Sequence, residues 1–486
     1  MITCAQENPP FVPRFSGYKH QHDILNAHWR DKHYALFWEM GLGKTKTVIE
    51  MAVKLYLAGE LDGVLIIAPK GAYLNWIFEE IGKHVPTEVR YRVGYYATYS
   101  TTKSRQALEE LMTAHDNVLD FMAINVESVA TVNGFHAAMR FARSHYAMCV
   151  VDESSRIKSP NAKRSKATVQ IGRECEYRRI MSGTPITRNP LDLWMQLEFL
   201  GPGLSGHRSF FSFRNYYAKI INMQMGNRTF PKIVGFRNVE ELSAHIQRLS
   251  DRRLKADCLD LPPKVFETVY VEWTPAQARV YNAMRNAALV EFDQGLVTST
   301  SALTTLMKLH QINCGHVKDD DGTVRTFEHN RLDTLVDLLE DVPGKTIIWA
   351  RFRHDILSIA GRLGEEFGER SRVMYYGGTS TLDRLDAMRR FKEDPDCRFF
   401  IANPASAGMS ITLVEATTAV YYSLSYSLEE WLQSQDRNHR IGQTKSTTYI
   451  TLAVANTVDT KLIGALQTKT DLAASVLDSF RQMLSF

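Results

Sequence analysis

Two glycines and a lysine near the start of the chain could bind phosphate groups. In Gly41-Leu42-Gly43-Lys44-Thr45 the glycines let the backbone turn and point N–H groups toward an anion. Lys44 adds a positive charge for the outer phosphates, and the Thr45 hydroxyl suits a Mg²⁺ ligand. The strict eight-residue phosphate-loop pattern has a glycine where Trp38 stands. A glycine-rich turn with an incidental lysine is therefore the alternative.

Two adjacent acids, Asp152 and Glu153, follow the apolar run at residues 148–151. Carboxylates at the end of a buried strand are costly unless they meet a cation or a polar ligand. Asp152 is suited to hold Mg²⁺ through water, and Glu153 to orient and deprotonate an attacking water molecule. Capping of a following helix is the alternative. The phosphate-binding pattern upstream favours the hydrolytic interpretation.

Two arginines near the far end of the chain, Arg437 and Arg440, have i, i+3 spacing. Ser427-Leu428-Glu429-Glu430 has the pattern of a capping box, and Gly442 suits the end of a helix. We therefore expect both guanidinium groups on one helix face, where they could neutralise charge that develops on a transferred phosphoryl group. A solvated surface with ion pairs to Asp436 and Glu430 explains this segment equally well.

Short apolar runs followed by polar or glycine-containing turns recur in the first part of the chain and again near its end. Such runs predict parallel strands covered by helices on both faces, with ligands bound beyond the carboxyl ends of the strands. The first set covers residues 33–38, 63–68, 121–124, 148–151 and 179–181. The second set covers residues 346–350, 373–376, 398–402, 419–422 and 448–452.

The sequence therefore predicts an α/β protein with two parallel-sheet lobes in tandem. We place the first lobe at residues 1–203 and the second at 329–486, with helical insertions and the linker between the lobes at 204–328. Within the linker region, residues 265–273 alternate like a strand and a helical region follows. A chain of 486 residues exceeds one comfortable core, in agreement with two or more domains.

Composition restricts function less than the motifs do. The formal charge of +4 and the isoelectric point of about 8.6 are mildly basic, so a basic groove is possible but not shown. The six cysteines include no pair at C-x-x-C spacing, which predicts neither a disulfide framework nor a zinc site. The sequence has no membrane-length apolar stretch and no secretory signal at its start, so we expect a cytoplasmic protein with no membrane partner.

Together these segments resemble the Swi/Snf-type branch of the superfamily-two helicases and translocases, in a minimal bacterial or phage-like form. Segments similar to the family's motifs follow one another in order over nearly the whole chain, and the Arg-Ile-Gly-Gln ending at residues 440–443 is close to diagnostic. The similar segments are 18–21, 39–45, 68–76, 152–155, 182–185, 252–264, 348–352, 405–413 and 435–443.

The resemblance implies two RecA-like lobes that use ATP and Mg²⁺, with catalytic roles for Lys44, Glu153, Arg437 and Arg440. The residues that it implies for ATP contact are Gln21, as the adenine reader, Met40, Gly41, Leu42, Gly43, Lys44, Thr45 and Gln435. Those that it implies for Mg²⁺ are Thr45 and Asp152. Those that it implies for DNA-backbone contact or coupling are Lys70, Ser182, Thr184, Ser406, Gly408 and Ser410.

The activity implied by the resemblance is ATP hydrolysis coupled to movement along double-stranded or branched DNA, without sequence preference. We expect a monomer in the cytoplasm of a bacterial or phage-infected cell that remodels DNA or protein–DNA complexes. One alternative is a strand-separating, fork-remodelling or annealing helicase with a wedge within residues 204–328. Another is a nucleic-acid-binding scaffold with a vestigial ATPase, which the intact phosphate, acid and arginine motifs disfavour.

Three residues depart from the family's pattern. Ser155 stands where the acidic box usually ends in histidine, so we expect altered coupling between hydrolysis and movement. Ala405 stands where an arginine is common, and Trp38 where an acid is usual. The basic clusters 158–166 and 248–255 could contact DNA or form solvated helix faces, and the sequence favours neither interpretation.

Overall fold

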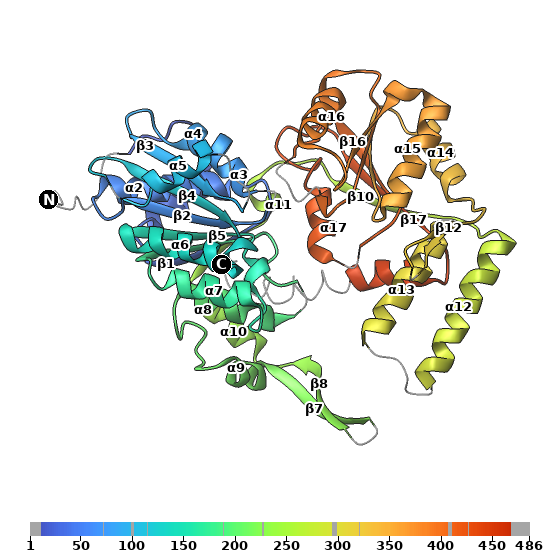
Figure 1. Cartoon of the computed structure of the whole chain (residues 1–486), viewed down its shortest axis with the longest axis horizontal. Helices are drawn as coiled ribbons and strands as arrows, with labels where there is room; N and C mark the ends of the chain where they lie inside the picture. The colour runs from blue at the N-terminus through green and yellow to red at the C-terminus, as the bar shows by residue number, and fades with distance from the viewer. Residues whose placement is uncertain are drawn as a thin grey trace. The chain divides into compact units, whose positions relative to one another are not determined.

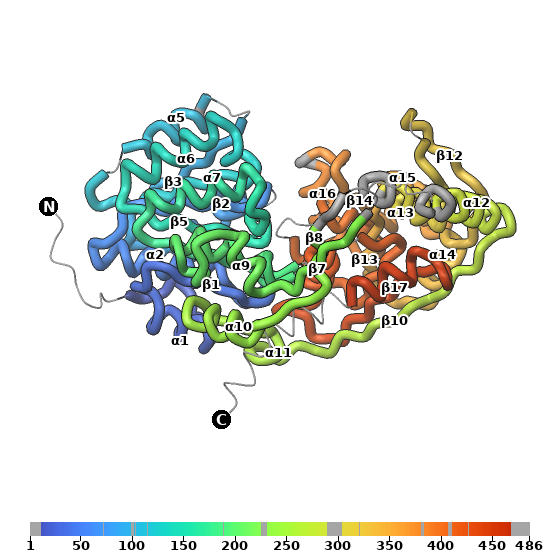
Figure 2. The backbone as a smooth tube through the Cα atoms, turned by 90° about the horizontal axis from the view of Figure 1, so that it is seen from below, coloured from blue at the N-terminus to red at the C-terminus, as the bar shows by residue number. Residues whose placement is uncertain are grey.

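The computed structural model describes residues 11–70, 72–98, 102–113, 115–187, 189–225, 228–293, 299–319, 321–406, 411–425 and 427–467. The described chain divides after Asp260 into two compact units, the second of which begins at Leu261 (Figure 1). In Figure 2 the backbone can be followed from α11 (Lys255–Cys258) into β10 (Lys264–Tyr270), the first strand of the second unit.

The first unit is built on a seven-stranded parallel sheet with the order β3-β4-β2-β5-β6-β1-β9. All five apolar runs of the first predicted set lie in this sheet, and the runs 33–38 and 63–68 coincide with whole strands. The strands are β1 (His33–Trp38), β2 (Gly63–Ala68), β3 (Tyr91–Tyr96), β4 (Leu119–Asn125), β5 (Ala147–Asp152), β6 (Tyr177–Met181) and β9 (Ser250–Arg253).

Helices cover both faces of this sheet. Along β1, Ala35 and Phe37 face one core while Leu36 and Trp38 face the other, as the alternation of side chains along a strand requires. The core that contains Phe37 includes residues of α5 (Thr102–Glu110), α6 (Val132–Ser144), α7 (Lys163–Gly172), α8 (Trp194–Leu200), α9 (Phe210–Tyr217) and α10 (Val239–Gln247). The core that contains Trp38 includes residues of α1 (Lys19–His28), α2 (Lys44–Leu57), α3 (Tyr73–Asn75), the π-helix Trp76–Glu80 and α4 (Ile81–His84).

The segment between α9 and Asp260 contains strands as well as the helices expected there. The antiparallel strands β7 (Ala218–Met225) and β8 (Arg228–Phe236) extend away from α9 and α10 in Figure 1. β9 then pairs in parallel with β1, although its four residues are polar. The insertions predicted as helical therefore also contain a hairpin and an edge strand of the first sheet.

The second unit is built on a six-stranded parallel sheet with the order β10-β17-β16-β13-β15-β14. The predicted strand at 265–273 is confirmed as its edge strand β10, and the second set of apolar runs supplies the remaining strands. These are β13 (Lys345–Trp349), β14 (Arg372–Tyr375), β15 (Phe399–Ala402), β16 (Ala416–Tyr421) and β17 (Thr447–Ala453).

Helices cover both faces of the second sheet as well. The core on one face includes residues of α14 (Arg331–Asp341) and α15 (Arg353–Phe367), and the core on the other includes residues of α16 (Thr381–Glu393) and α17 (Leu428–Gln435). Helices α12 (Pro275–Asp293) and α13 (Ser299–Asn313) and the hairpin β11–β12 (His316–Lys318, Val324–Thr326) lie between β10 and α14 in the chain. The predicted fold class, α/β with two RecA-like parallel-sheet lobes in tandem, is confirmed.

Across the residues that the structure describes, no helix combines the length and the apolar character needed to cross a bilayer.

Candidate active site

The phosphate-binding pattern and the paired acids lie at the carboxyl edge of the first sheet. β5, β6 and β1 are neighbours in that order, so Asp152 at the end of β5 and Ser182 after β6 lie near the loop that follows β1. A Cβ added at Gly183 would lie 3.4 Å from Met40 Cγ, so the segment after β6 packs on this loop. These predicted site residues therefore converge at the edge where parallel sheets bind ligands.

The loop backbone between β1 and α2 requires its glycines. Gly41 and Gly43 have φ angles of 84° and 80°, a left-handed conformation that strains residues with a Cβ. A Cβ on Gly43 would also lie 2.1 Å from the Nε2 atom of Gln21. Because α2 begins at Lys44, directly after this turn, its first free N–H groups and its positive end face the loop. This arrangement suits an anion such as a phosphate group.

The Lys44 side chain lies along the same loop. Its Nζ atom donates to the backbone oxygens of Trp38 at 2.8 Å and Glu39 at 3.2 Å, and the residue is buried. Its charge also reaches Asp152, where it counteracts the rise in the pKa of that carboxyl. The ammonium group is therefore close to both the phosphate loop and the acid pair.

Asp152 is half-buried, and its carboxyl group accepts from two hydrogen-bond donors. Burial raises its pKa above the ordinary value, against the effects of the donors and of Lys44. Trp76 Nε1 donates to Oδ2 at 3.0 Å, and the backbone N–H of Glu153 donates to Oδ1 at 2.9 Å. A carboxylate here and the Thr45 hydroxyl, on the second residue of α2, are hard oxygen ligands of the kind that Mg²⁺ prefers. The donor set therefore fits Mg²⁺.

Glu153 has a strained backbone. Its φ and ψ angles of 50° and 59° are left-handed, which is uncommon for a residue other than glycine and recurs at functional sites. Ser182 Oγ donates to Glu153 Oε2 at 3.4 Å and accepts from the backbone N–H of Thr184 at 3.1 Å. The predicted base is thereby connected to two of the predicted coupling residues.

Gln21, the predicted adenine reader, is buried against the phosphate loop. Its Nε2 atom donates to the carbonyl oxygen of Leu42 at 2.9 Å, and its Oε1 atom accepts from the backbone N–H of Tyr18 at 3.2 Å. His20 Nε2 also lies 2.9 Å from the Leu42 oxygen. The structure therefore places Gln21 beside the loop, and its role toward adenine stays a prediction.

Part of the basic cluster at 248–255 closes the edge of the sheet beside the phosphate loop. Trp38, which stands where an acid is usual, donates through Nε1 to Asp251 Oδ2 at 2.5 Å. Arg252 Nη1 donates to the Phe37 carbonyl oxygen at 3.1 Å, and Arg253 Nε to Asp251 Oδ2 at 2.9 Å. These contacts give the cluster a structural role that the sequence analysis did not predict.

Two other predicted residues of the first unit lie apart from these contacts. Lys70 follows β2 and is exposed. Ser155 is buried, and among the described residues its hydroxyl has no hydrogen-bond partner. A third residue of this unit, Trp76, donates to Asp152 and lies in the segment 68–76 that resembles a family motif, but no role was predicted for it.

The arginine segment of the second unit differs from its prediction. Ser427 caps α17 as expected, with its hydroxyl accepting from the Glu430 backbone N–H at 3.2 Å. The helix ends at Gln435, however, so Arg437 and Arg440 do not share one helix face, and that prediction is wrong. The reason is tertiary: the Arg437 carbonyl accepts from the Leu413 backbone N–H at 2.8 Å, which draws the chain out of the helix.

Uncharged side chains fix the loop that carries the arginines. Tyr449 Oη lies within hydrogen-bond distance of two acceptors, the Gln435 carbonyl oxygen at 2.9 Å and Asn438 Oδ1 at 3.1 Å. Gln443 Nε2 donates to the Val414 carbonyl at 3.0 Å, and its Oε1 accepts from two backbone N–H groups at 3.1 Å. The Arg437 side chain is 3% exposed, whereas Arg440 is half-buried. Lys264 Nζ donates to Gln435 Oε1 at 3.1 Å, so the predicted nucleotide contact Gln435 is held from β10.

The segment that resembles motif five follows β15. Asn403 Nδ2 donates to the Arg351 carbonyl at 2.6 Å, while its Oδ1 accepts from the Ala405 backbone N–H at 2.8 Å. The predicted contact Ser406 is half-buried in this turn. Gly408 and Ser410, also predicted, lie outside the described residues. Asn403 therefore joins two motif-like segments, a role that the sequence analysis missed.

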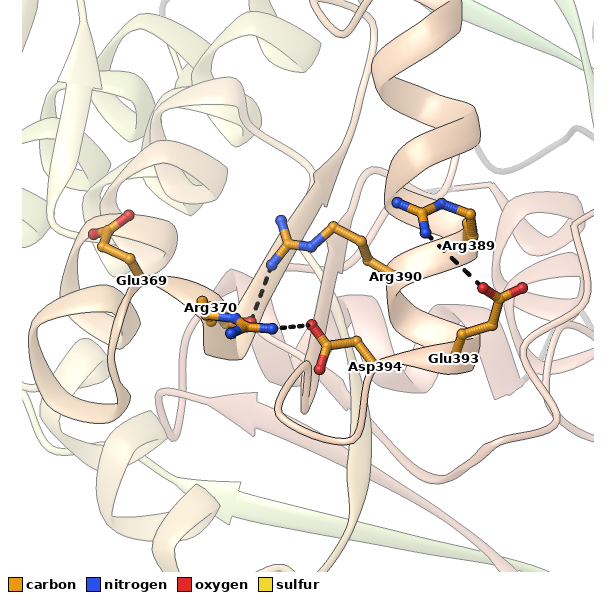
Figure 3. Close-up of a pocket in the computed structure, with 6 residues that line it drawn as sticks. All are labelled: Glu369, Arg370, Arg389, Arg390, Glu393 and Asp394. Carbon is orange, nitrogen blue, oxygen red and sulfur yellow. Dashed lines mark hydrogen bonds and ion pairs between the residues drawn. The ribbon is translucent and has the colours of Figure 1, made fainter.

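A charged hollow of about 520 Å³ in the second unit contains none of the predicted residues (Figure 3). Two of its three arginines are paired with acids: Arg370 Nη2 lies 3.4 Å from Asp394 Oδ2, and Arg389 Nη1 lies 4.0 Å from Glu393 Oε2. Paired acidic and basic side chains of this kind are typical of a solvated surface, so we assign this hollow no role in nucleotide binding.

Two protein-family models match the chain. The SNF2-related domain matches residues 20–317, and the helicase conserved C-terminal domain matches residues 330–442. Similar proteins include the DNA annealing helicase and endonuclease ZRANB3 of Homo sapiens, 26% identical over 458 residues, covering 92% of this chain and 39% of that protein. An uncharacterized ATP-dependent helicase of Mycoplasma genitalium, MG018, is 26% identical over 449 residues, covering 90% of this chain and 40% of that protein.

The chain thus spans about two fifths of the length of these curated relatives. Among solved structures, the Sulfolobus solfataricus SWI2/SNF2 ATPase core in complex with dsDNA is 25% identical, with a TM-score of 0.43, covering 99% of this chain and 97% of that one. The family models together cover most of the chain and carry the assignment. The chain therefore belongs to the SNF2-related family of ATP-hydrolysing superfamily-two enzymes.

Proposed function

We propose that the chain is an ATP-driven translocase on double-stranded DNA. The observation that carries the proposal is the convergence of Lys44, Asp152 and Glu153 at one sheet edge, with Ser182 bonded to Glu153 and Thr184 bonded to Ser182. A hydrolytic group connected to residues that could touch a DNA backbone provides a route from ATP hydrolysis to movement.

In the proposed reaction the loop at Gly41–Thr45 holds the phosphates, and Glu153 accepts a proton from the water that attacks the γ-phosphorus. The bond from that phosphorus to the β–γ bridging oxygen breaks, leaving ADP and inorganic phosphate. Mg²⁺, held by Thr45 and Asp152, would neutralise charge on the phosphate oxygens. Arg437 and Arg440 would supply further positive charge to the transferred phosphoryl group.

For the DNA contacts we propose Lys70, Thr184 and Ser406, together with Gly408 and Ser410. Contacts from such groups to phosphates position a protein without reading bases, as a motor working on any sequence requires. Relatives of the chain carry the names DNA annealing helicase and ATP-dependent helicase, which agrees with a nucleic-acid substrate.

The test is the ATPase rate with single-stranded DNA, duplex DNA of increasing length, branched DNA and RNA. A translocase on duplex DNA should be stimulated by duplex, and the stimulation should rise with duplex length before it saturates. Equal stimulation by RNA and DNA would instead favour a general nucleic-acid-binding protein. Stimulation that ignores length would contradict continuous movement along the duplex.

A second candidate, fork remodelling, is favoured by the hairpin β7–β8. Residues 199–239 contain no acidic residue, and on the hairpin Ile221 and Val234 are 48% and 52% exposed. Phosphate attraction combined with apolar contact suits a wedge at a strand junction. The basic residues of this stretch are Arg208, Arg214, Lys219, Arg228, Lys232 and Arg237.

A forked substrate with a labelled strand tests this candidate. If the hairpin is a wedge, the double variant Lys219→Glu/Lys232→Glu should lose strand release or fork regression but keep duplex-stimulated ATP hydrolysis. A wild-type chain that hydrolyses ATP on forks without releasing or re-pairing strands would rule this candidate out and leave the translocase.

A further inference from the structure

The second unit contains a cluster of metal-ligand types that the ATPase chemistry does not use. His316 lies on β11, and His354 and Asp355 lie in the first turn of α15. One ligand atom from each residue lies within 4.8 Å of the others. His316 and Asp355 are 2% and 1% exposed, while His354 is half-buried.

Two of these ligand atoms face each other without a hydrogen-bond partner. His316 Nδ1 and Asp355 Oδ1 are 3.3 Å apart, and within the described part of the chain neither atom makes a hydrogen bond of acceptable geometry. Buried polar atoms are rarely left in this state, because the loss of water is then not compensated. With bonds of about 2.0–2.1 Å, two ligands of one tetrahedral zinc ion lie roughly 3.3 Å apart. The observed separation therefore fits two ligands of one ion.

Neighbouring groups hold the Asp355 carboxyl as outer contacts hold a metal ligand. Asp355 Oδ2 accepts from Ser423 Oγ at 2.8 Å, and Ser423 Oγ accepts from the Arg351 backbone N–H at 2.8 Å. Such contacts fix the orientation of a ligand.

Cys314, two residues before His316, lies outside this group of three. Its buried thiol accepts a hydrogen bond from Arg331 Nη1 at 3.3 Å.

We propose that His316, His354 and Asp355 bind a divalent transition metal. Two imidazoles and a carboxylate form a donor set that suits Zn²⁺, with water in the remaining position, rather than Mg²⁺ or Ca²⁺. The ion would tie the segment after α13 to the first turn of α15. The sequence shows no zinc-ligand spacing because His316 lies far from His354 and Asp355 in the chain.

The test uses the full-length protein, stripped with a chelator and titrated with Zn²⁺ or Co²⁺. We expect one equivalent of zinc per chain, a tetrahedral Co²⁺ absorption spectrum and a higher melting temperature with zinc. His316→Gln and Asp355→Asn should each lower zinc affinity by about 100-fold or more. Loss of a residue that only hydrogen-bonds a metal ligand already costs about 10- to 100-fold in affinity, and each of these variants loses a ligand itself. The control His329→Gln, a half-buried histidine outside the cluster, should bind zinc like the wild type.

Two results would overturn the site. One is zinc uptake no greater in the wild type than in the His316→Gln/Asp355→Asn double variant, which would identify a buried histidine–carboxyl pair without an ion. The other is a Co²⁺ spectrum unchanged by these substitutions. His354→Gln serves as a further variant should the buried substitutions prevent folding, as judged by circular dichroism.

Discussion

The nucleotide-binding edge of the first unit and the arginine loop of the second are held in different ways. At the first sheet edge, the residues proposed for chemistry also support one another: Lys44 lies near Asp152, and Ser182 contacts Glu153. In the second unit, separate amide and hydroxyl side chains, such as Gln443 and Tyr449, hold the loop that carries the arginines. At the first sheet edge, the residues proposed for catalysis therefore also position one another. In the arginine loop, the residues proposed for catalysis are positioned by other residues.

The arginine loop should show the largest single effect on turnover. Arg440→Ala should lower kcat by about 10³-fold or more while ATP and DNA binding change little, because the charge is needed mainly as the phosphoryl group transfers. Steady-state ATPase kinetics and nucleotide titration measure this difference. Arg389→Ala removes an arginine from the charged hollow of the same unit and should leave kcat unchanged. An unchanged kcat in Arg440→Ala would mean that Arg440 is a solvated surface residue without a role in catalysis.

At the first sheet edge, Glu153→Gln should lower kcat by about 10²–10⁴-fold, the usual contribution of a general base. The isosteric amide keeps the side-chain volume, so ATP and duplex binding should persist. Single-turnover hydrolysis and filter binding give the two readouts. Glu127→Gln, an exposed acid just after β4, is the matched control. Normal turnover in Glu153→Gln would show that another group activates the water.

The division between chemistry and positioning in the second unit can be tested with Gln443→Ala. Its loss leaves buried backbone groups without partners, which should cost about 1–3 kcal/mol of unfolding free energy. A displaced loop should also lower kcat, by about 100-fold for a shift of about 1 Å. Urea unfolding and ATPase rates measure both effects, with the exposed Thr444→Ala as the control. Lower stability with normal kcat would mean that the loop does not position the arginines.

The smallest effect is expected from Ser182→Ala. Its hydroxyl joins Glu153 to the Thr184 backbone, and one hydrogen bond contributes about 0.5–1.5 kcal/mol. We therefore expect movement per ATP hydrolysed to fall by up to about tenfold, with a smaller change in ATP hydrolysis itself. The ratio of translocation rate to ATPase rate measures this, and Ser16→Ala, at an exposed serine of the same unit, is the control. A constant ratio would remove Ser182 from the coupling route.

Much of the first unit's site follows from local sequence. Buried parallel strands are apolar along their length, so β1 and β2 are recognised with their bounds, and the polar residues that follow strands of this sheet predict the edge where a ligand binds. β9 was missed because its residues Ser250–Arg253 carry no apolar run. Its place depends on pairing with β1, which no local pattern records.

The end of α17 shows a second limit of local patterns. Capping by Ser427 was predicted, but the helix ends at Gln435 because the Arg437 carbonyl accepts from Leu413, a partner distant in sequence. Helix propensity is a weak signal that such tertiary contacts override. Trp76 was also given no role, since an indole that donates to Asp152 looks like any core aromatic residue in the sequence.

The most direct test of the proposed function is displacement of a third DNA strand from a blunt duplex that carries a triplex segment. The wild-type chain with ATP should release the third strand, whereas Glu153→Gln and Arg440→Ala should bind the duplex and leave the triplex intact. Release by these variants at the wild-type rate would contradict the account. So would rapid, duplex-stimulated hydrolysis by the wild type without any release.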